Sequence, residues 1–149
     1  MRAAVAAYSS RMDTRVEATS AVPDFVGTSV FLVEDSSVIR ERLLEMLHAI
    51  PAVKVIGHAE TAADAIEQIS IRQPTVVVLD IKLKGGSGIK VLQTVKQHLP
   101  AIVVIMLTNY ATPEFRQRCL QAGADYFLDK TNEFQNIASI LEQLNCTQR

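Results

Sequence analysis

Five short apolar segments, each followed by an amphipathic helix pattern, are the feature that most restricts how this chain can fold. The segments have the length of β-strands, and the stretch after each carries apolar residues every three or four positions, as on one face of an α-helix. The strand-like segments are residues 30–33, 53–59, 75–79, 101–107 and 126–128. Strict alternation of strands and helices predicts an α/β domain, (βα)₅, built on a parallel sheet.

The polarity of the segments predicts their order in the sheet. The first, third and fourth are almost wholly apolar, so we expect them at the centre, with helices covering both faces. The second carries Lys54 and His58, which suits an edge. Right-handed crossovers then favour the strand order 2-1-3-4-5, with a crevice where the order reverses between strands one and three.

Local signals predict the helix ends and their buried faces. Ser37 and Thr61 are predicted N-caps, and Pro113 suits the first turn of the fourth helix. The fourth helix is expected to turn Phe115, Cys119 and Leu120 inward, and the last helix to carry an apolar stripe of Phe134, Ile137, Leu141 and Leu144.

Composition indicates one globular domain with a distinct leading segment. We expect residues 28–149 to fold and residues 1–27, rich in Ala, Ser, Thr and Arg, to be an extension that is disordered or a short helix. No apolar stretch reaches the length of a membrane span, and Cys119 and Cys146 lack CxxC spacing, so a reducing, cytoplasmic location is expected. The net charge of −1, with no dense basic block, predicts no nucleic-acid binding by this chain alone.

Polar residues follow four of the predicted strands at the point where each ends. They are Glu34-Asp35, Asp80, Thr108 and Asp129-Lys130. The ends of parallel strands meet at one edge of the sheet, so these side chains should surround one crevice. Clustered carboxylates stay ionised when a hard cation such as Mg²⁺ or Mn²⁺ neutralises them, and such ions commonly bind phosphate as well.

The cluster suits phosphoryl transfer to a carboxylate. Asp80 follows a buried strand and precedes the glycine-bearing loop 85–88, which leaves it accessible as a nucleophile able to form an aspartyl phosphate. Lys130 and Thr108 offer an amine and a hydroxyl donor for phosphoryl oxygens. Alone, Glu34-Asp35 could be acids that only favour a helix N-terminus, and Lys130 or Thr108 could be solvated and idle. It is their joint occurrence at strand ends that favours function.

These motifs together resemble the receiver domain of two-component response regulators. The matching segments are residues 31–35, 77–81, 85–88, 106–108 and 122–130, and the resemblance covers Thr28 to about Asn145. It implies a flavodoxin-like fold. It also implies that Asp80 accepts a phosphoryl group from a histidine kinase or a histidine phosphotransfer protein, in a phosphoacceptor that assists its own phosphorylation and dephosphorylation and is not otherwise an enzyme.

The resemblance also implies the roles of the neighbouring residues. Asp35 and Asp80 would bind Mg²⁺ directly, the backbone carbonyl of Lys82 would be a third ligand, and Glu34 would act through water. Thr108 and Lys130 would contact the phosphoryl group. Phe127 matches the family's switch aromatic, whose side chain moves inward when the Thr108 hydroxyl moves toward the phosphate.

The chain departs from the family pattern near the site. Lys84 and Thr131 stand where many receivers have proline, and Asn109 replaces a small residue. Lys82 and Tyr110 occupy positions that flank the phosphoryl group. We hypothesise that they restrict the access of water to it and lengthen its lifetime, the alternative being that both extend into solvent.

Several interpretations stay open at this stage. A phosphohydrolase with a DxD motif would need an acid at position 82, which Lys82 does not supply, and a receiver-like scaffold could act without phosphorylation. The chain is expected to be a stand-alone receiver that contacts a downstream protein, although excision from a longer regulator is an alternative. The sequence does not distinguish a relay, a phosphate sink and an effector, and it leaves a homodimer open.

Overall fold

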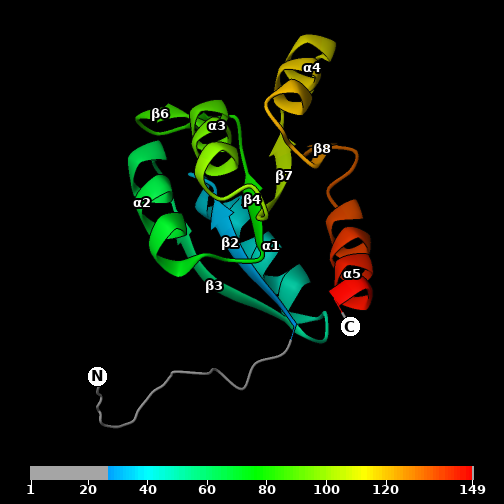
Figure 1. Ribbon diagram of the computed structural model, residues 1–149. Coiled ribbons are helices and arrows are strands. Elements are labelled where there is room, and N and C mark those ends of the chain that lie inside the picture. Colours follow the sequence, from blue (N-terminus) through cyan, green and yellow to red (C-terminus); the bar gives the residue numbers. More distant parts are fainter. Residues whose placement is uncertain (1–26, 149) are drawn as a thin grey trace, which may run out of the picture.

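A five-stranded parallel sheet forms the centre of the protein (Figure 1). The computed structural model describes residues 27–148, so the predicted extension, apart from Gly27, lies outside the described residues. The strand order is β3-β2-β4-β7-β8, which confirms the predicted order 2-1-3-4-5. The strands are β2 (Thr28–Val33), β3 (Val53–Ala59), β4 (Val76–Leu79), β7 (Val103–Thr108) and β8 (Tyr126–Asp129).

Helices cover both faces of this sheet (Figure 1). They are α1 (Ser37–His48), α2 (Ala62–Arg72), α3 (Gly88–His98), α4 (Pro113–Gln121) and α5 (Asn136–Gln148). Alternate residues of each strand point to opposite faces, which produces two apolar cores. One core packs α2, α3 and α4 against one face, and the other packs α1 and α5 against the opposite face.

The helix ends follow the predicted capping chemistry, with one correction. The hydroxyl of Thr61 accepts a hydrogen bond from the backbone of Asp64 at 3.2 Å, and Pro113 opens α4. The N-cap of α1 is Ser36, not the predicted Ser37, because Ser36 has the extended backbone of a cap and its hydroxyl accepts from the Ile39 N–H at 3.3 Å.

Two predictions about buried helix faces are wrong in detail. Leu120 on α4 is 46% exposed, because α4 packs on the sheet through Cys119 and the half-buried Phe115. Phe134 is buried but precedes the first turn of α5, which begins at Asn136. A short hairpin of β5 (Lys82–Leu83) and β6 (Gly86–Ser87) was not predicted and lies directly after β4.

Among residues 27–148, none of the helices combines the length and the apolar character needed to cross a bilayer.

Candidate functional site

The carboxyl-terminal ends of four neighbouring strands, β2, β4, β7 and β8, bring the predicted residues together. Val33 on β2 pairs with Leu79 on β4, so the residues that follow them, Glu34 and Asp80, leave adjacent strands at the same level. The backbone N–H of Lys130 donates to the carbonyl oxygen of Thr108 at 2.9 Å, which ties the end of β8 to the end of β7. The strand ends therefore bring polar side chains from four strands to one edge of the sheet.

Three carboxylates form the acidic part of the site. Glu34, Asp35 and Asp80 each offer an oxygen, and these oxygens all lie within 4.8 Å of one another. Glu34 and Asp80 are buried, and Asp35 is half-buried. Converging carboxylate oxygens at this spacing fit a hard divalent cation such as Mg²⁺, which prefers oxygen ligands.

Lys130 connects two of the three acids. Its Nζ donates to Asp80 Oδ2 and to Glu34 Oε1, both at 2.9 Å, and its side chain is only 7% exposed. Burial alone would lower the pKa of Lys130, but the hydrogen bonds and charges of Asp80 and Glu34 outweigh burial and raise that pKa above its usual value. The lysine therefore stays protonated between the two carboxylates.

The buried position of Glu34 carries a desolvation cost. Burial raises the pKa of Glu34, although Lys130 and the backbone N–H of Ser36, which donates to Glu34 Oε2 at 3.1 Å, both act to lower it. Arg40 on α1 donates to the backbone oxygen of Glu34 at 2.9 Å and pairs with Glu60 at 3.4 Å. Arg40 was not singled out from the sequence, and its signal is a cation in the first turn of a helix, where the macrodipole disfavours it unless it has a local partner.

Asp80 is held in place by its own loop. Its Oδ1 accepts from the N–H of Ile81 at 2.7 Å, while its Oδ2 faces Lys130. Gly88, the first residue of α3, lies against this strand end: a Cβ built on it would come 1.8 Å from the carbonyl oxygen of Asp80. The last position of the glycine-bearing loop therefore has to be glycine, because a larger residue at Gly88 would collide with the backbone of Asp80.

Thr108, Lys82 and Tyr110 lie at the ends of the neighbouring elements. Thr108 is fully buried, and its hydroxyl accepts from the backbone N–H of Tyr110 at 3.0 Å. Lys82 and Tyr110 are exposed, yet they contact each other: the Lys82 Nζ lies 4.8 Å from the centre of the Tyr110 ring. The ring of Tyr110 also meets Phe115 edge to face, with the ring centres 6.5 Å apart.

Phe127 lies in the core beside the site. It is 4% exposed, and the guanidinium of Arg116 on α4 lies 4.8 Å from the centre of its ring. Arg116 also donates to the backbone oxygen of Phe127 at 3.4 Å and approaches Glu133 at 3.9 Å. No sequence signal singled out Arg116, because its partner is eleven residues away on a strand.

Comparison with known proteins shows the family. The sequence model of the protein family described as the response regulator receiver domain matches residues 30–142. The chain belongs to the response regulator receiver domain family. The matched region contains every residue of the site described above.

Two of the curated relatives that this chain resembles are transcriptional regulators. The DNA-binding transcriptional activator DevR/DosR of Mycobacterium tuberculosis is 30% identical over 115 residues, which cover 77% of this chain and 53% of the relative. The transcriptional regulatory protein DesR of Bacillus subtilis is 28% identical over 116 residues, covering 78% of this chain and 57% of the relative. The chain spans about half the length of these two relatives.

A solved structure supports the same fold. The signal receiver domain of the response regulator NarL from Mycobacterium tuberculosis superposes with a TM-score of 0.73 at 26% identity, covering 80% of this chain and 96% of that one. The doubly wound sheet with helices on both faces is thus the arrangement of a known receiver.

Proposed function

We propose that this receiver domain accepts a phosphoryl group on Asp80. The observation that carries the proposal is the position of Lys130, whose buried ammonium group contacts Asp80 and Glu34 at 2.9 Å beside the third carboxylate, Asp35. A protonated amine beside Asp80, with a cation held by the converging acids, can neutralise the charge that an aspartyl phosphate adds.

The transfer is a displacement at phosphorus. One carboxylate oxygen of Asp80 attacks the phosphorus atom, the new O–P bond forms, and the bond from phosphorus to the donor breaks, so that the donor leaves with the electron pair. Lys130 and the hydroxyl of Thr108 then donate hydrogen bonds to phosphoryl oxygens. This exchange moves Lys130 from a carboxylate to the phosphate, and its charge stays paired throughout.

The acids would also hold a cation. Asp35 and Asp80 would bind Mg²⁺ or Mn²⁺ directly, with Glu34 acting through water and the carbonyl oxygen of Lys82 as a further ligand. When bound, the ion would supply positive charge to the phosphoryl oxygens, a Lewis-acid contribution that the protein's own donors complement.

Both the donor of the phosphoryl group and the downstream partner are proteins. A histidine kinase or a histidine phosphotransfer protein supplies the phosphoryl group. Movement of Thr108 toward the phosphate alters the packing around Phe127, which changes the face formed by α4, β8 and α5 that a downstream protein contacts. The chain itself acts as a phosphoacceptor and does not turn over a separate substrate.

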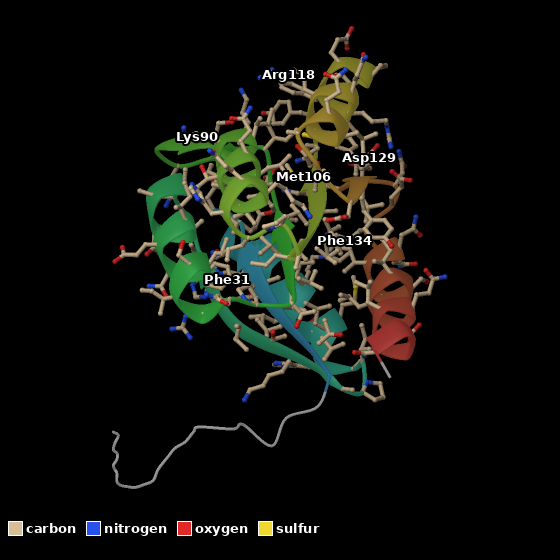
Figure 2. All side chains as sticks on the ribbon, in the orientation of Figure 1. Phe31, Lys90, Met106, Arg118, Asp129 and Phe134 are labelled. Carbon is tan, nitrogen blue, oxygen red and sulfur yellow. The ribbon has the colours of Figure 1, made fainter. Side chains whose placement is uncertain are left out.

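Intact mass spectrometry tests the phosphoacceptor. The parent protein, incubated with acetyl phosphate and Mg²⁺, is expected to gain the mass of one phosphoryl group, and Asp80→Asn is expected to gain none. Asp129→Asn is the matched control, because Asp129 also ends a strand (Figure 2) but its carboxylate bonds to Thr131 and Asn132. A phosphorylated Asp80→Asn variant would contradict the proposal.

Lys82 and Tyr110 are proposed to slow the loss of the phosphoryl group. Their contact at 4.8 Å supports the idea, since it holds two bulky side chains together next to the strand ends. An exposed cation–π contact is worth about 0.5–1 kcal/mol, so Lys82→Ala or Tyr110→Ala should dephosphorylate about two- to fivefold faster. Lys84→Ala and Tyr110→Phe are controls expected to keep the parent rate, and equal rates for all variants would rule the role out.

A further inference from the structure

Positive charge is concentrated in one stretch of the sequence. Residues 81–124 contain six Lys and Arg residues and one acidic residue, Glu114, although the whole chain has 15 basic and 16 acidic residues. This stretch forms the β5–β6 hairpin, α3, β7 and α4. Since β7 is buried in the sheet, the charges lie on the hairpin and the two helices.

Three of these cations have no acidic partner. Within residues 27–148, Lys82, Lys90 and Arg118 form no ion pair, whereas Lys84 pairs with Glu60 at 3.3 Å and Lys96 with Asp125 at 2.8 Å. All three are exposed. Figure 2 shows Lys90 on α3 and Arg118 on α4 at the same end of the molecule.

A groove runs between the elements that carry these charges. One cavity of about 210 Å³ lies between the hairpin and Phe115 of α4, and a second of about 290 Å³ lies between Gln93 of α3 and Gln121 of α4. Ile89 and Arg118 line both cavities, so the two adjoin. We call them together the α3–α4 groove.

We propose that the α3–α4 groove binds an acidic segment of a protein partner. Arg118, which lines both cavities, would pair with one carboxylate of the segment, and the exposed Lys90, which follows Ile89 on α3, would pair with a second. The half-buried Phe115 would contact an apolar side chain of the segment. Unpaired cations beside a groove give charge complementarity to such a segment, which speeds encounter and fixes its orientation.

Other occupants fit the groove less well. Small-molecule sites are enclosed and mostly apolar, whereas the exposed Lys82, Gln93 and Arg118 line much of this groove. A nucleic acid is a long polyanion, and the carboxylates of the adjoining site, together with a net charge of −1, would repel its continuation beyond the groove.

The proposal does not depend on phosphorylation of Asp80, so it is tested on the unphosphorylated full chain. The probe is a short fluorescein-labelled peptide of Asp and Glu with a central Leu-Phe pair, and its binding is measured by fluorescence anisotropy. We expect it to bind more tightly than the same peptide with Asn and Gln in place of the acids. Arg118→Glu and Lys90→Glu should each weaken binding about tenfold, as loss of a charge pair worth about 1.4 kcal/mol would.

Two further variants sharpen the result. Lys54→Glu makes the same change of charge at an exposed position of the edge strand β3, away from the groove, and should keep the parent affinity. Gln93→Glu adds an acid to the groove without removing a cation and should also weaken binding, with circular dichroism checking that each variant is folded.

Three outcomes would overturn the proposal. Equal binding of the acidic and amide peptides would remove the charge complementarity on which it rests. An equal loss for Lys54→Glu and Arg118→Glu would show binding governed by net charge. Tighter, Arg118-dependent binding of an oligothymidine of the same length would assign the surface to nucleic acid.

Discussion

Replacing Lys130 with methionine would remove the cation shared by two buried carboxylates while keeping the length of the side chain. At an effective dielectric of about 20, each of its two contacts at 2.9 Å is worth about 6 kcal/mol before desolvation. Desolvation and the repulsion between the acids cancel most of this, and removing one partner of a buried pair typically costs about 3–5 kcal/mol. We therefore expect a large loss of stability.

Protonation of Glu34 limits that loss. Without Lys130, the negative charges of Glu34 and Asp80 would be buried next to each other. Protonating Glu34 is the least costly way to remove one of them, because burial already raises the pKa of Glu34 above its reference value of 4.5. Protonating a carboxyl with that reference pKa costs about 3.4 kcal/mol at pH 7 and about 1.4 kcal/mol at pH 5.5. A carboxyl whose pKa is higher in the folded than in the unfolded protein stabilises the folded state more as the pH falls toward the pKa of the unfolded chain. Lys130→Met should therefore lose about 3 kcal/mol of stability at pH 7 and less than half of that at pH 5.5.

Urea unfolding at the two pH values, in buffer with EDTA, measures this loss. Lys84→Met is the control, because its ion pair with Glu60 is exposed and should contribute little to stability. Adding Glu34→Gln to Lys130→Met should recover much of the loss at pH 7, since the amide introduced by that substitution is neutral without taking up a proton. If Lys130→Met unfolds at the parent's urea concentration, or loses more stability at pH 5.5 than at pH 7, the electrostatic argument is wrong.

Three further experiments test other parts of the structure. Gly88→Ala should lower the free energy of unfolding by more than about 2 kcal/mol in urea titrations, because its Cβ would lie 1.8 Å from the Asp80 carbonyl oxygen, and a stable variant would contradict this close approach. Ser36→Ala should cost about 1 kcal/mol by the same measurement and Ser37→Ala little, whereas the reverse ranking would place the cap at Ser37. In a Cys146→Ser background, Cys119 should react with a thiol reagent only as the protein unfolds in urea, because burial shields the thiol and raises its pKa; fast labelling of the folded protein would contradict that burial.

The strand order and the site could be predicted because each depends on a strong local signal. A run such as Val76–Leu79 that is apolar at every position has to be covered on both faces, and that fixes its place at the centre of the sheet. Residues that directly follow such runs share one edge, so Glu34, Asp80 and Lys130 could be grouped without knowledge of distances.

Features that depend on packing between distant elements could not be predicted in this way. The β5–β6 hairpin has two residues in each strand, too few for a periodic pattern. Leu120 and Cys119 are adjacent in sequence, and periodicity alone placed both inward, but the short helix α4 has a narrow contact with the sheet and buries Cys119 alone. The contacts of Lys130 with both Glu34 and Asp80 could not be predicted either, because the sequence shows which charges lie near an edge of the sheet and not which of them pair.

The α3–α4 groove shows that the net charge of a chain does not describe how charge is distributed over its surface. A net charge of −1 argues against a polyanion bound over the whole surface, and that argument stands, yet it says nothing about a face that exposes Lys82, Lys90 and Arg118, which form no ion pair within residues 27–148. The fold places this face beside the carboxylates at the strand ends, because the β5–β6 hairpin that carries Lys82 follows β4 directly. Opposite charges on adjoining surfaces would orient an approaching partner that carries both signs, with its acidic segment toward Arg118 and any cation toward the three acids.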